Sequence, residues 1–280
     1  MKNVERRIHP APLLLALALL LALIPVGMHA FASEPVVEVN SWTDFSTAMA
    51  NDSTAGAGTV YQLQKDLTLS GMIPIVSSFK GTFDGMGHTI SIEKGSYFAT
   101  STDAGLGLFC EVSGGTVKNL IISMNGTLYA GVNQRNLMEN VANEHYGVIA
   151  GRLIGGATIS RCAIYRTAQD AAFWVTVDNN KRDDAYVGLF CGAAFESTID
   201  QCYADVSVTG CRDNALPDGT QDASVRSDAT MSAAMVTGAL VKSTVSNCCL
   251  YYGEVNVQHN DPTLNSGYSA VAAPVAATAS

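Results

Sequence analysis

The sequence predicts an all-β solenoid, a parallel β-helix that opens with a short N-terminal capping helix. The first reason is a pattern that recurs four times in the 280 residues, at a period of about 40 to 46 residues, which is typical of a repeat architecture. The second reason is the composition. Only 15% of the residues are charged and 25 are glycine, which suits short strands joined by turns better than helices.

Residues 1–32 have the features of a secretory signal peptide. A basic start with Arg6 and Arg7 precedes an apolar run over 13–24, and small residues up to Ala32 form a cleavage site. The apolar run is shorter than the about 17–25 residues that a membrane span needs. We therefore expect an exported protein, secreted or at the cell surface, that begins at Ser33; the alternative is an uncleaved anchor.

The chain is acidic. Its formal net charge of −9 becomes −11 without residues 1–32, which carry three positive charges and one negative charge. An acidic surface repels nucleic acids and anionic lipids, so we expect no nucleic-acid partner. We also expect no membrane span in the mature chain.

Residues 33–58 are expected to form a lead-in followed by the capping helix. Residues 41–50 place apolar side chains at helical spacing, and Ser41 is a suitable N-cap. Such a helix would cover the end of the solenoid, where strand edges are otherwise open. Its apolar positions are Trp42, Phe45, Ala48 and Met49.

The solenoid itself is expected over 59–273. Residues 60–69 alternate apolar and polar side chains, as a half-buried strand does. The next elements, in chain order, are expected to be strands at 73–76 and 79–83, a glycine turn at 84–88 and a strand at 89–92.

Each of the four copies of the pattern has two halves. The first half is expected to be a Gly-aliphatic strand, and it reads GLFC at 107–110, GVIAG at 147–151, GLFCG at 188–192 and MVTGA at 235–239. The second half is a further strand, and it reads GTVKNL at 115–120, ATISRC at 157–162, STIDQC at 197–202 and STVSNC at 243–248.

Repetition at a fixed phase predicts three inward columns of stacked side chains. Each fully buried aliphatic or aromatic side chain contributes about 1.5–3 kcal/mol. The strand of the second half is expected to continue through the third column. The columns are Phe109, Ile149, Phe190 and Thr237; Val117, Ile159, Ile199 and Val245; and Leu120, Cys162, Cys202 and Cys248.

Polar segments of variable length separate the copies, as in solenoids that accept insertions on one side. They lie at 133–144, 178–184 and 212–229. Residues 267–273 have the pattern of a fifth Gly-aliphatic strand, and 274–280 are expected to be an unstructured tail. Either that strand ends the solenoid or the chain is a shortened form of a longer protein.

Two motifs resemble a known family. Residues 79–90, FKGTFDGMGHTI, resemble the opening of secreted bacterial β-helices, and the copies resemble the GLUG-motif repeats of bacterial surface and adhesin-like proteins. The resemblance covers most of the chain after residue 32 and implies a right-handed parallel β-helix of the pectin-lyase-like fold. The copy at 235–239 departs from the pattern because its leading glycine is missing.

The cysteines are expected to be mainly structural. Three share a column with Leu120, and a position that accepts leucine or cysteine is typical of a buried apolar slot. Neighbouring strands lie about 4.7–4.9 Å apart, whereas the Cβ atoms of a disulfide lie about 3.5–4.5 Å apart, so we expect stacked thiols. The most plausible local disulfide is Cys202–Cys211. The seven cysteines, which show no spacing typical of zinc, are Cys110, Cys162, Cys191, Cys202, Cys211, Cys248 and Cys249.

The sequence predicts no catalytic, cofactor-binding or metal-binding residue. Asp84 and His88 flank a glycine turn, and turn chemistry explains them without catalysis. The acidic pair Asp183 and Asp184 lies beside two basic residues, which is typical of a solvated loop; these are Lys181 and Arg182.

A glycoside hydrolase needs two carboxyl groups about 5–9.5 Å apart. On a solenoid this requires acids at one phase of neighbouring coils. The phase of Asp200 does not provide them, because it is held in the other copies by Lys118, Ser160 and Ser246.

We therefore expect a non-catalytic surface or secreted module that serves adhesion, or binds a glycan or protein, through its loops and exposed strand faces. The alternative is a polysaccharide lyase or glycoside hydrolase of the same fold. Aromatic residues on strands more often pack than bind ligands. Those that could contact a sugar are Tyr129, Tyr146, Trp174, Tyr251 and Tyr252.

Overall fold

The computed structural model describes residues 34–52, 54–99, 105–131, 145–178, 184–213, 230–251, 253–259, 269–273 and 275–279. The chain divides into two units, Met1–Glu34 and Pro35–Ser280, and the described strands lie in the second. The expected signal peptide lies outside the described residues and stays a prediction. No helix in the described ranges is long and apolar enough to cross a membrane.

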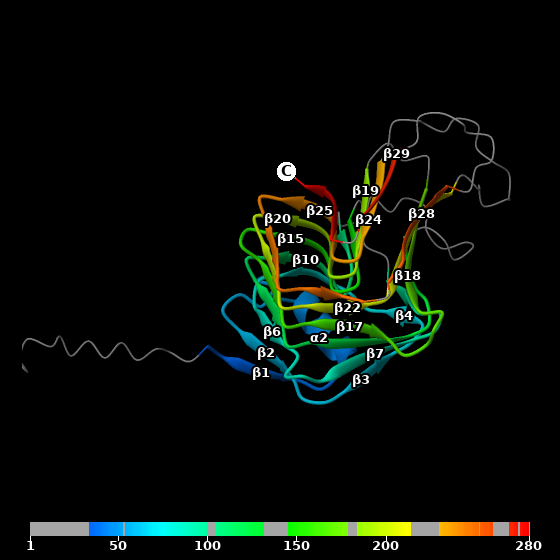
Figure 1. Ribbon diagram of the computed structural model, residues 1–280. Coiled ribbons are helices and arrows are strands. Elements are labelled where there is room, and N and C mark those ends of the chain that lie inside the picture. Colours follow the sequence, from blue (N-terminus) through cyan, green and yellow to red (C-terminus); the bar gives the residue numbers. More distant parts are fainter. Residues whose placement is uncertain are drawn as a thin grey trace, which may run out of the picture. The chain divides into compact units, whose positions relative to one another are not determined.

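The second unit is a parallel β-helix, as predicted, and its strands stack in register along the solenoid (Figure 1). We call one complete turn of the chain a coil. A full coil contributes one short strand to each of five sheets, which are numbered 1 to 5 in the order in which the chain visits them. The strands of each sheet pair in parallel with those of the coils before and after.

Sheet 1 consists of β1 (Val36–Val39), β2 (Val60–Leu63), β6 (Thr82–Asp84), β11 (Thr116–Lys118), β16 (Thr158–Ser160), β21 (Thr198–Asp200) and β26 (Thr244–Ser246). Sheet 2 consists of β3 (Leu67–Leu69), β7 (Thr89–Glu93), β12 (Ile121–Asn125), β17 (Ala163–Arg166), β22 (Tyr203–Asp205) and β27 (Cys249–Leu250). Sheet 3 consists of β4 (Met72–Ile73), β8 (Tyr97–Phe98), β13 (Leu128–Gly131), β18 (Ala172–Asp178), β23 (Ser207–Asp213) and β28 (Val255–His259).

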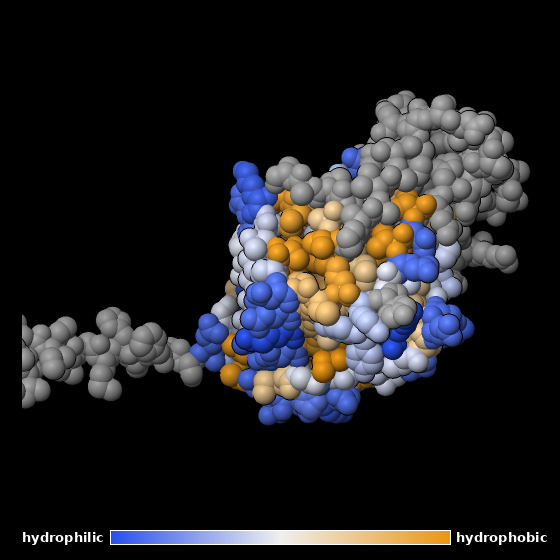
Figure 2. All heavy atoms as spheres, viewed as in Figure 1, coloured by the Kyte–Doolittle hydropathy of each residue, from blue (hydrophilic) through white to orange (hydrophobic). Residues whose placement is uncertain are grey.

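Sheet 4 consists of β9 (Gly105–Leu106), β14 (His145–Gly147), β19 (Ala185–Gly188), β24 (Thr230–Ala234) and β29 (Ser269–Ala273). Sheet 5 consists of β5 (Val76–Phe79), β10 (Phe109–Ser113), β15 (Ala150–Ile154), β20 (Cys191–Phe195), β25 (Thr237–Val241) and β30 (Ala276–Ala279). Figure 2 shows hydrophobic residues gathered around β24 and β25, where sheets 4 and 5 meet.

The single described helix, α2 (Trp42–Ala50), confirms the expected capping element. The side chain of Ser41 accepts a hydrogen bond from the Asp44 nitrogen, as an N-cap does. The expected apolar face is correct except at Ala48, which is exposed, while Ser46 is buried in its place. The helix is therefore anchored by its buried aromatic residues and Met49.

The interior confirms the second predicted column. Val117 is in register with Ile159, which is in register with Ile199 and then Val245. The column also extends toward the N-terminal coils, where Phe83 pairs with Val117 and is fully buried. Each coil thus buries one apolar side chain against its neighbours at this position.

The third predicted column is also inward, but it lies at a corner rather than within a strand. β11 ends at Lys118 and β12 begins at Ile121, so the strand does not continue through Leu120. In each coil, the residue directly before the column residue has a left-handed backbone conformation. The chain turns there, and the side chain of the column residue points into the core. These turn residues are Asn119 (φ 52°), Arg161 (φ 52°), Gln201 (φ 54°) and Asn247 (φ 53°).

The first predicted column is out of register. Phe109 pairs with Ala150 rather than Ile149, and Thr237 pairs with Cys191 rather than Phe190. The Gly-Leu-Phe motif is not a continuous strand, because it bends between sheets 4 and 5. Phe109 is shifted because it lies three residues after Leu106, whereas Ala150 lies four residues after Tyr146, the register partner of Leu106. Thr237 is shifted because Ala234, rather than Met235, is in register with Gly188.

The expectation of an unstructured tail at 274–280 is wrong over Ala276–Ala279, which form β30 and pair with β25. These small residues carry little pattern, but the edge of β25 supplies hydrogen-bond partners for them. The predicted fifth Gly-aliphatic strand corresponds to β29. The fifth copy therefore contributes strands to both sheet 4 and sheet 5.

The predicted polar excursions all connect a strand of sheet 3 to a strand of sheet 4. The residues at 132–144, 179–183 and 214–229 lie outside the described residues. Their flanking strands occupy equivalent positions in successive coils, so the insertions enter the solenoid at one edge, as expected.

Candidate ligand-binding surface

The outward side of sheet 3 carries a row of aromatic side chains. Tyr129 is in register with Tyr97 on one side and with Trp174 on the other. All three side chains are half-buried. Because adjacent parallel strands lie about 4.8 Å apart, the three rings are presented by consecutive coils along the solenoid axis. We call Tyr97, Tyr129 and Trp174 the aromatic column.

Strand alternation explains why these rings face outward. On β13 the neighbours of Tyr129 are buried in the core, and on β18 the neighbours of Trp174 are buried likewise. The period of two then places the rings on the opposite face of the sheet. The buried neighbours are Leu128, Ala130, Phe173 and Val175.

Polar groups continue and flank the aromatic column. Trp174 is in register with Thr209, which is followed in the next coil by Asn256. The indole nitrogen of Trp174 donates to Thr176 Oγ1 at 3.2 Å, so the ring is held on the outer face by a hydrogen bond. Thr209 is only 4% exposed, so the accessible neutral hydrogen-bonding group of this row is Asn256.

An ion pair lies beside the column. Lys94 Nζ contacts Asp170 Oδ2 at 2.8 Å, and the two residues lie two coils apart, on either side of the coil that carries Tyr129. The Asp170 carboxylate, by hydrogen bond and charge, raises the pKa of Lys94, and the Tyr129 phenol adds a smaller effect. The two charges neutralise one another, so this flank does not strongly favour an anionic or a cationic ligand.

Of the aromatic residues selected from the sequence, Tyr129 and Trp174 are brought together. Tyr146 is only 1% exposed and belongs to the core. Tyr251 is 54% exposed but lies in the connection from β27 to β28 and is not one of the register positions of the aromatic column. Tyr252 lies outside the described residues. Tyr97 was missed because no repeated motif surrounds it; its signal is the alternation in the short β8.

Asp84 and His88 are not assembled into one site. Asp84 Oδ1 accepts from the Met86 nitrogen at 2.9 Å, which is the turn role predicted for it. His88 Nδ1 instead lies 3.3 Å from Asp66 Oδ1, and that carboxylate also accepts from the Thr89 nitrogen at 2.9 Å. Asp84 thus accepts from the backbone of its own turn, and Asp66 accepts from the backbone of the next coil.

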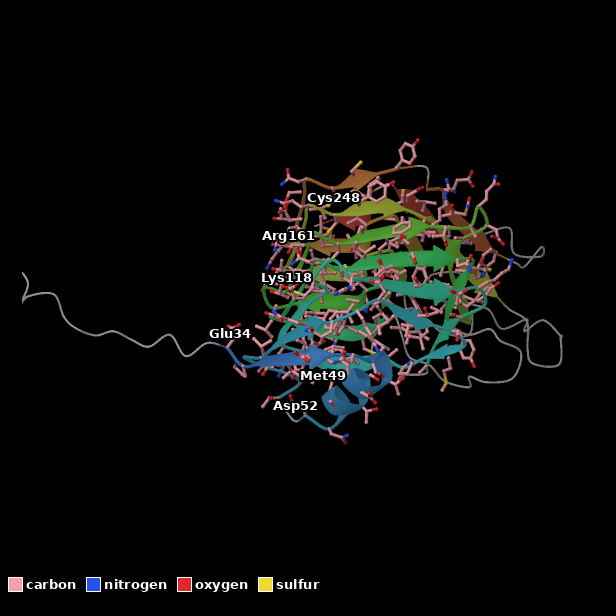
Figure 3. The ribbon with its side chains drawn as sticks, turned by 90° about the horizontal axis from the view of Figure 1, so that it is seen from below. Glu34, Met49, Asp52, Lys118, Arg161 and Cys248 are labelled. Atoms are coloured by element: carbon pink, nitrogen blue, oxygen red, sulfur yellow. The ribbon has the colours of Figure 1, made fainter. Side chains whose placement is uncertain are left out.

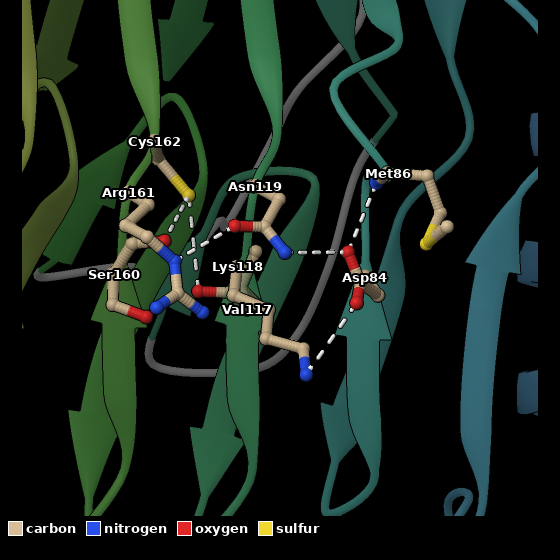
Figure 4. Close-up of polar contacts among 8 residues, drawn as sticks. All are labelled: Asp84, Met86, Val117, Lys118, Asn119, Ser160, Arg161 and Cys162. Carbon is tan, nitrogen blue, oxygen red and sulfur yellow. Dashed lines mark hydrogen bonds and ion pairs between the residues drawn. The ribbon is translucent and has the colours of Figure 1, made fainter.

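Asp84 also begins a row of polar contacts along the corner between sheets 1 and 2 (Figure 4). Asn119 Nδ2 donates to Asp84 Oδ1 at 2.8 Å, and Arg161 Nε donates to Asn119 Oδ1 at 2.8 Å. Lys118 Nζ lies 3.4 Å from Asp84 Oδ2. Lys118 and Arg161 follow one another along this corner in Figure 3. The contacts tie three consecutive coils together.

The ion pair predicts an acid-dependent contribution of Asp84 to stability. Burial raises the pKa of Asp84, but hydrogen bonds from Asn119 and the Met86 nitrogen and the Lys118 charge together hold it below its ordinary value of 3.8. The stabilisation is therefore present above pH 3.8 and is lost as the pH falls through the lower, folded-state pKa.

We expect Asp84→Asn to reduce the free energy of unfolding by about 1 kcal/mol at neutral pH, because the charge-assisted contacts are lost. At the lowest pH at which both proteins stay folded the difference should be smaller, since the native carboxyl becomes protonated as the pH falls through its lowered pKa. Urea unfolding of both proteins at the two pH values measures this. An equal deficit at both values would show that Asp84 acts by packing instead.

Two other partly buried carboxylates face cations. Glu111 Oε2 lies 2.6 Å from Arg152 Nη2 in sheet 5, and Asp205 Oδ1 lies 3.5 Å from Arg166 Nε in sheet 2. The prediction that residues without a carboxylate occupy the position of Asp200 in the neighbouring coils is confirmed, because Ser160 and Ser246 are in register with it. Among the described residues, no group of three metal-binding side chains is found.

The predicted mixed-charge loop is largely outside the described residues, including Asp183. Asp184 is described, and its Oδ2 accepts from the Tyr186 hydroxyl at 3.2 Å. This contact joins two residues at the start of β19 in sheet 4, and it involves no second carboxylate.

The cysteine column behaves as a row of buried thiols. Cys162 and Cys202 are each 2% exposed, and both have free thiols. A hydrogen bond with the Cys162 thiol is the largest of the effects that raise the pKa of Cys202 to about 12. Protonated, inward sulfur atoms fit the predicted apolar slot and are poor nucleophiles at neutral pH.

Comparisons of this chain with protein families, with curated proteins and with solved structures found no match. The parallel β-helix with its aromatic column is therefore the basis on which a function is proposed.

Proposed function

We propose that the protein is an exported, non-catalytic module that binds a carbohydrate through the aromatic column of sheet 3. The observation that carries the proposal is the register of Tyr97, Tyr129 and Trp174 on one outward face. Sugar rings present flat apolar faces edged by hydroxyl groups, and aromatic rings with nearby hydrogen-bonding groups complement both.

The charge distribution supports a neutral glycan. The formal net charge of −9 disfavours polyanions, and the only ion pair described beside the column, Lys94–Asp170, is internally balanced. Asn256, which is exposed and continues the row beyond the buried Thr209, is a neutral donor and acceptor. A linear chain lying along the solenoid axis would meet one aromatic side chain per coil.

The resemblance of the repeats to GLUG-motif proteins supports a surface or adhesin-like setting, and the basic, apolar start of the sequence supports export. Adhesion through glycan binding is consistent with both a surface setting and export. The variable segments between sheets 3 and 4 leave the solenoid at the edge next to the aromatic column, so they could contribute to specificity.

The proposal predicts that Trp174→Ala and Tyr129→Ala each weaken glycan binding by about 10- to 30-fold, because aromatic anchors at the centre of a site contribute most of its affinity. The chain after residue 32 is first screened on an array of neutral, acidic and basic glycans. The best soluble ligand is then titrated against each variant by calorimetry.

Tyr251→Ala is the matched control, because Tyr251 is exposed but lies beyond sheet 2. Its affinity should be unchanged. A loss of affinity in Tyr251→Ala but not in Trp174→Ala would place the ligand elsewhere. Release of new reducing or unsaturated sugar ends from a polysaccharide would instead favour the enzyme alternative.

A further inference from the structure

Three cysteines occupy one corner position in three consecutive coils. Each thiol donates to a backbone oxygen two residues earlier, so the three sulfur atoms are aimed alike. The contacts are Cys162 to the Ser160 oxygen at 3.4 Å, Cys202 to the Asp200 oxygen at 3.2 Å, and Cys248 to the Ser246 oxygen at 3.2 Å.

The coil backbones hold Cys202 and Cys248 side by side. The Cys249 nitrogen donates to the Cys202 oxygen at 2.8 Å, and Tyr203 is in register with Cys249. Cys248 Sγ also contacts the Ile199 oxygen at 4.0 Å, so it is aimed toward the coil that carries Cys202. A strand spacing of about 4.8 Å lies within the Cα separation of about 4.4–6.8 Å that disulfides span. The Cβ atoms must approach from the strand spacing to about 3.5–4.5 Å when the bond forms, which is why the reduced column holds stacked thiols.

Exposure distinguishes the members of the column. Cys162 and Cys202 are each 2% exposed, whereas Cys248 is only half-buried. A small reagent therefore reaches the sulfur of Cys248 first. Cys202 is then the next thiol in the row, in the coil toward which Cys248 Sγ is directed.

We infer that Cys202 and Cys248 are a thiol pair that forms a disulfide by exchange with a small-molecule disulfide. The Cys248 thiol loses its proton to solvent, and the thiolate attacks one sulfur of the reagent and expels the other as a thiolate. The deprotonated Cys202 sulfur then attacks Cys248 Sγ and displaces the second reagent thiolate. The protein loses two protons and two electrons, and the reagent takes them up and is reduced to two thiols.

The reaction is slow at neutral pH and accelerates in alkali. The hydrogen bond to Cys202 and then burial raise the pKa of Cys248 above its ordinary value of 9.0. Only the thiolate attacks a disulfide, so the rate should rise with pH up to that raised value. The product links the coil of β22 to the coil of β27 and restrains the unfolded chain between the two residues.

The test treats the folded chain after residue 32 with oxidised glutathione at mildly alkaline pH. Remaining thiols are blocked, and the protein is digested without reduction for mass spectrometry. We expect a peptide pair joined through Cys202 and Cys248 and a melting temperature raised by about 5 °C or more. Cys249→Ser should preserve both results, because Cys249 is exposed on the outer side.

Cys248→Ser is the negative control and should abolish the linked pair and the thermal shift. A stable glutathione adduct on Cys248, a link between Cys248 and Cys249, a link between Cys162 and Cys202, or a fully reduced product would each overturn the inference. None of these outcomes bears on glycan binding, which is measured separately on the reduced protein.

Discussion

Gly192→Ala is expected to lower the free energy of unfolding by about 3 kcal/mol or more, because the added methyl group has no space. A Cβ atom at Gly192 would collide with the Tyr146 nitrogen, lie 2.6 Å from the His145 carbonyl carbon and lie 2.8 Å from the Gly151 oxygen. All three are backbone atoms of the preceding coil, so relief requires β14 and β20 to separate.

The control is Gly71→Ala. Gly71 has a left-handed backbone (φ 66°), and nothing lies within 4 Å of a Cβ atom built there. The change should cost only the conformational penalty of about 1–2 kcal/mol. Urea unfolding followed by circular dichroism measures both variants. Equal costs would show that close packing at the corner between sheets 4 and 5 does not determine the effect.

Trp42→Ala is expected to destabilise the protein by about 3–5 kcal/mol, because it empties the core contact of the capping helix. The indole ring centre lies 5.4 Å from Phe45, 5.9 Å from Phe83 and 5.7 Å from Phe109. Its nitrogen also donates to the Pro74 oxygen at 2.6 Å. One residue therefore joins α2 to the first two coils.

Two variants separate the parts of this effect. Trp42→Phe keeps an aromatic ring but loses the hydrogen bond, and should cost about 1–3 kcal/mol. Thr47→Ala changes an exposed helix position and should be within about 0.5 kcal/mol of the unaltered protein. If Trp42→Ala were as mild as Thr47→Ala in thermal and urea unfolding, α2 would not be a required cap.

The repeats predict the coils because burial imposes the same choice at the same phase. Val117, Ile159, Ile199 and Val245 occupy one register position as expected from their spacing. The capping helix is equally predictable, since Trp42, Phe45 and Met49 define its buried side. Apolar patterns that repeat between coils, or that follow one face of a helix, therefore predict the buried positions correctly.

The corners could not be predicted in detail. A left-handed residue is usually recognised as glycine, yet Arg161 and Gln201 adopt this backbone at the corner between sheets 1 and 2. The bend between sheets 4 and 5 is one residue shorter before Phe109 than before Ala150, which displaced the expected register of Phe109. The fourth copy starts its register at Ala234 rather than Met235, which displaced that of Thr237. The alanines of β30 carry too little pattern to reveal a strand.

The aromatic column was only partly predictable. Tyr129 and Trp174 are visible as aromatic residues on strands, but their alignment depends on segments of different length between them. Tyr97 lies on a strand of two residues and has no motif around it. Alignment across coils, rather than the residues themselves, distinguishes a continuous surface from separate packing residues.

The fluorescence of Trp174 during a glycan titration tests the central claim most directly. The chain contains two tryptophans, and Trp42 is 2% exposed whereas Trp174 is half-buried on the proposed surface. A bound neutral glycan is expected to shift and quench the emission in a saturable way, and Trp174→Phe should remove that response. A saturable response that persists in Trp174→Phe, or glycan binding with no change in the unaltered protein, would contradict the assignment of sheet 3 as the binding face.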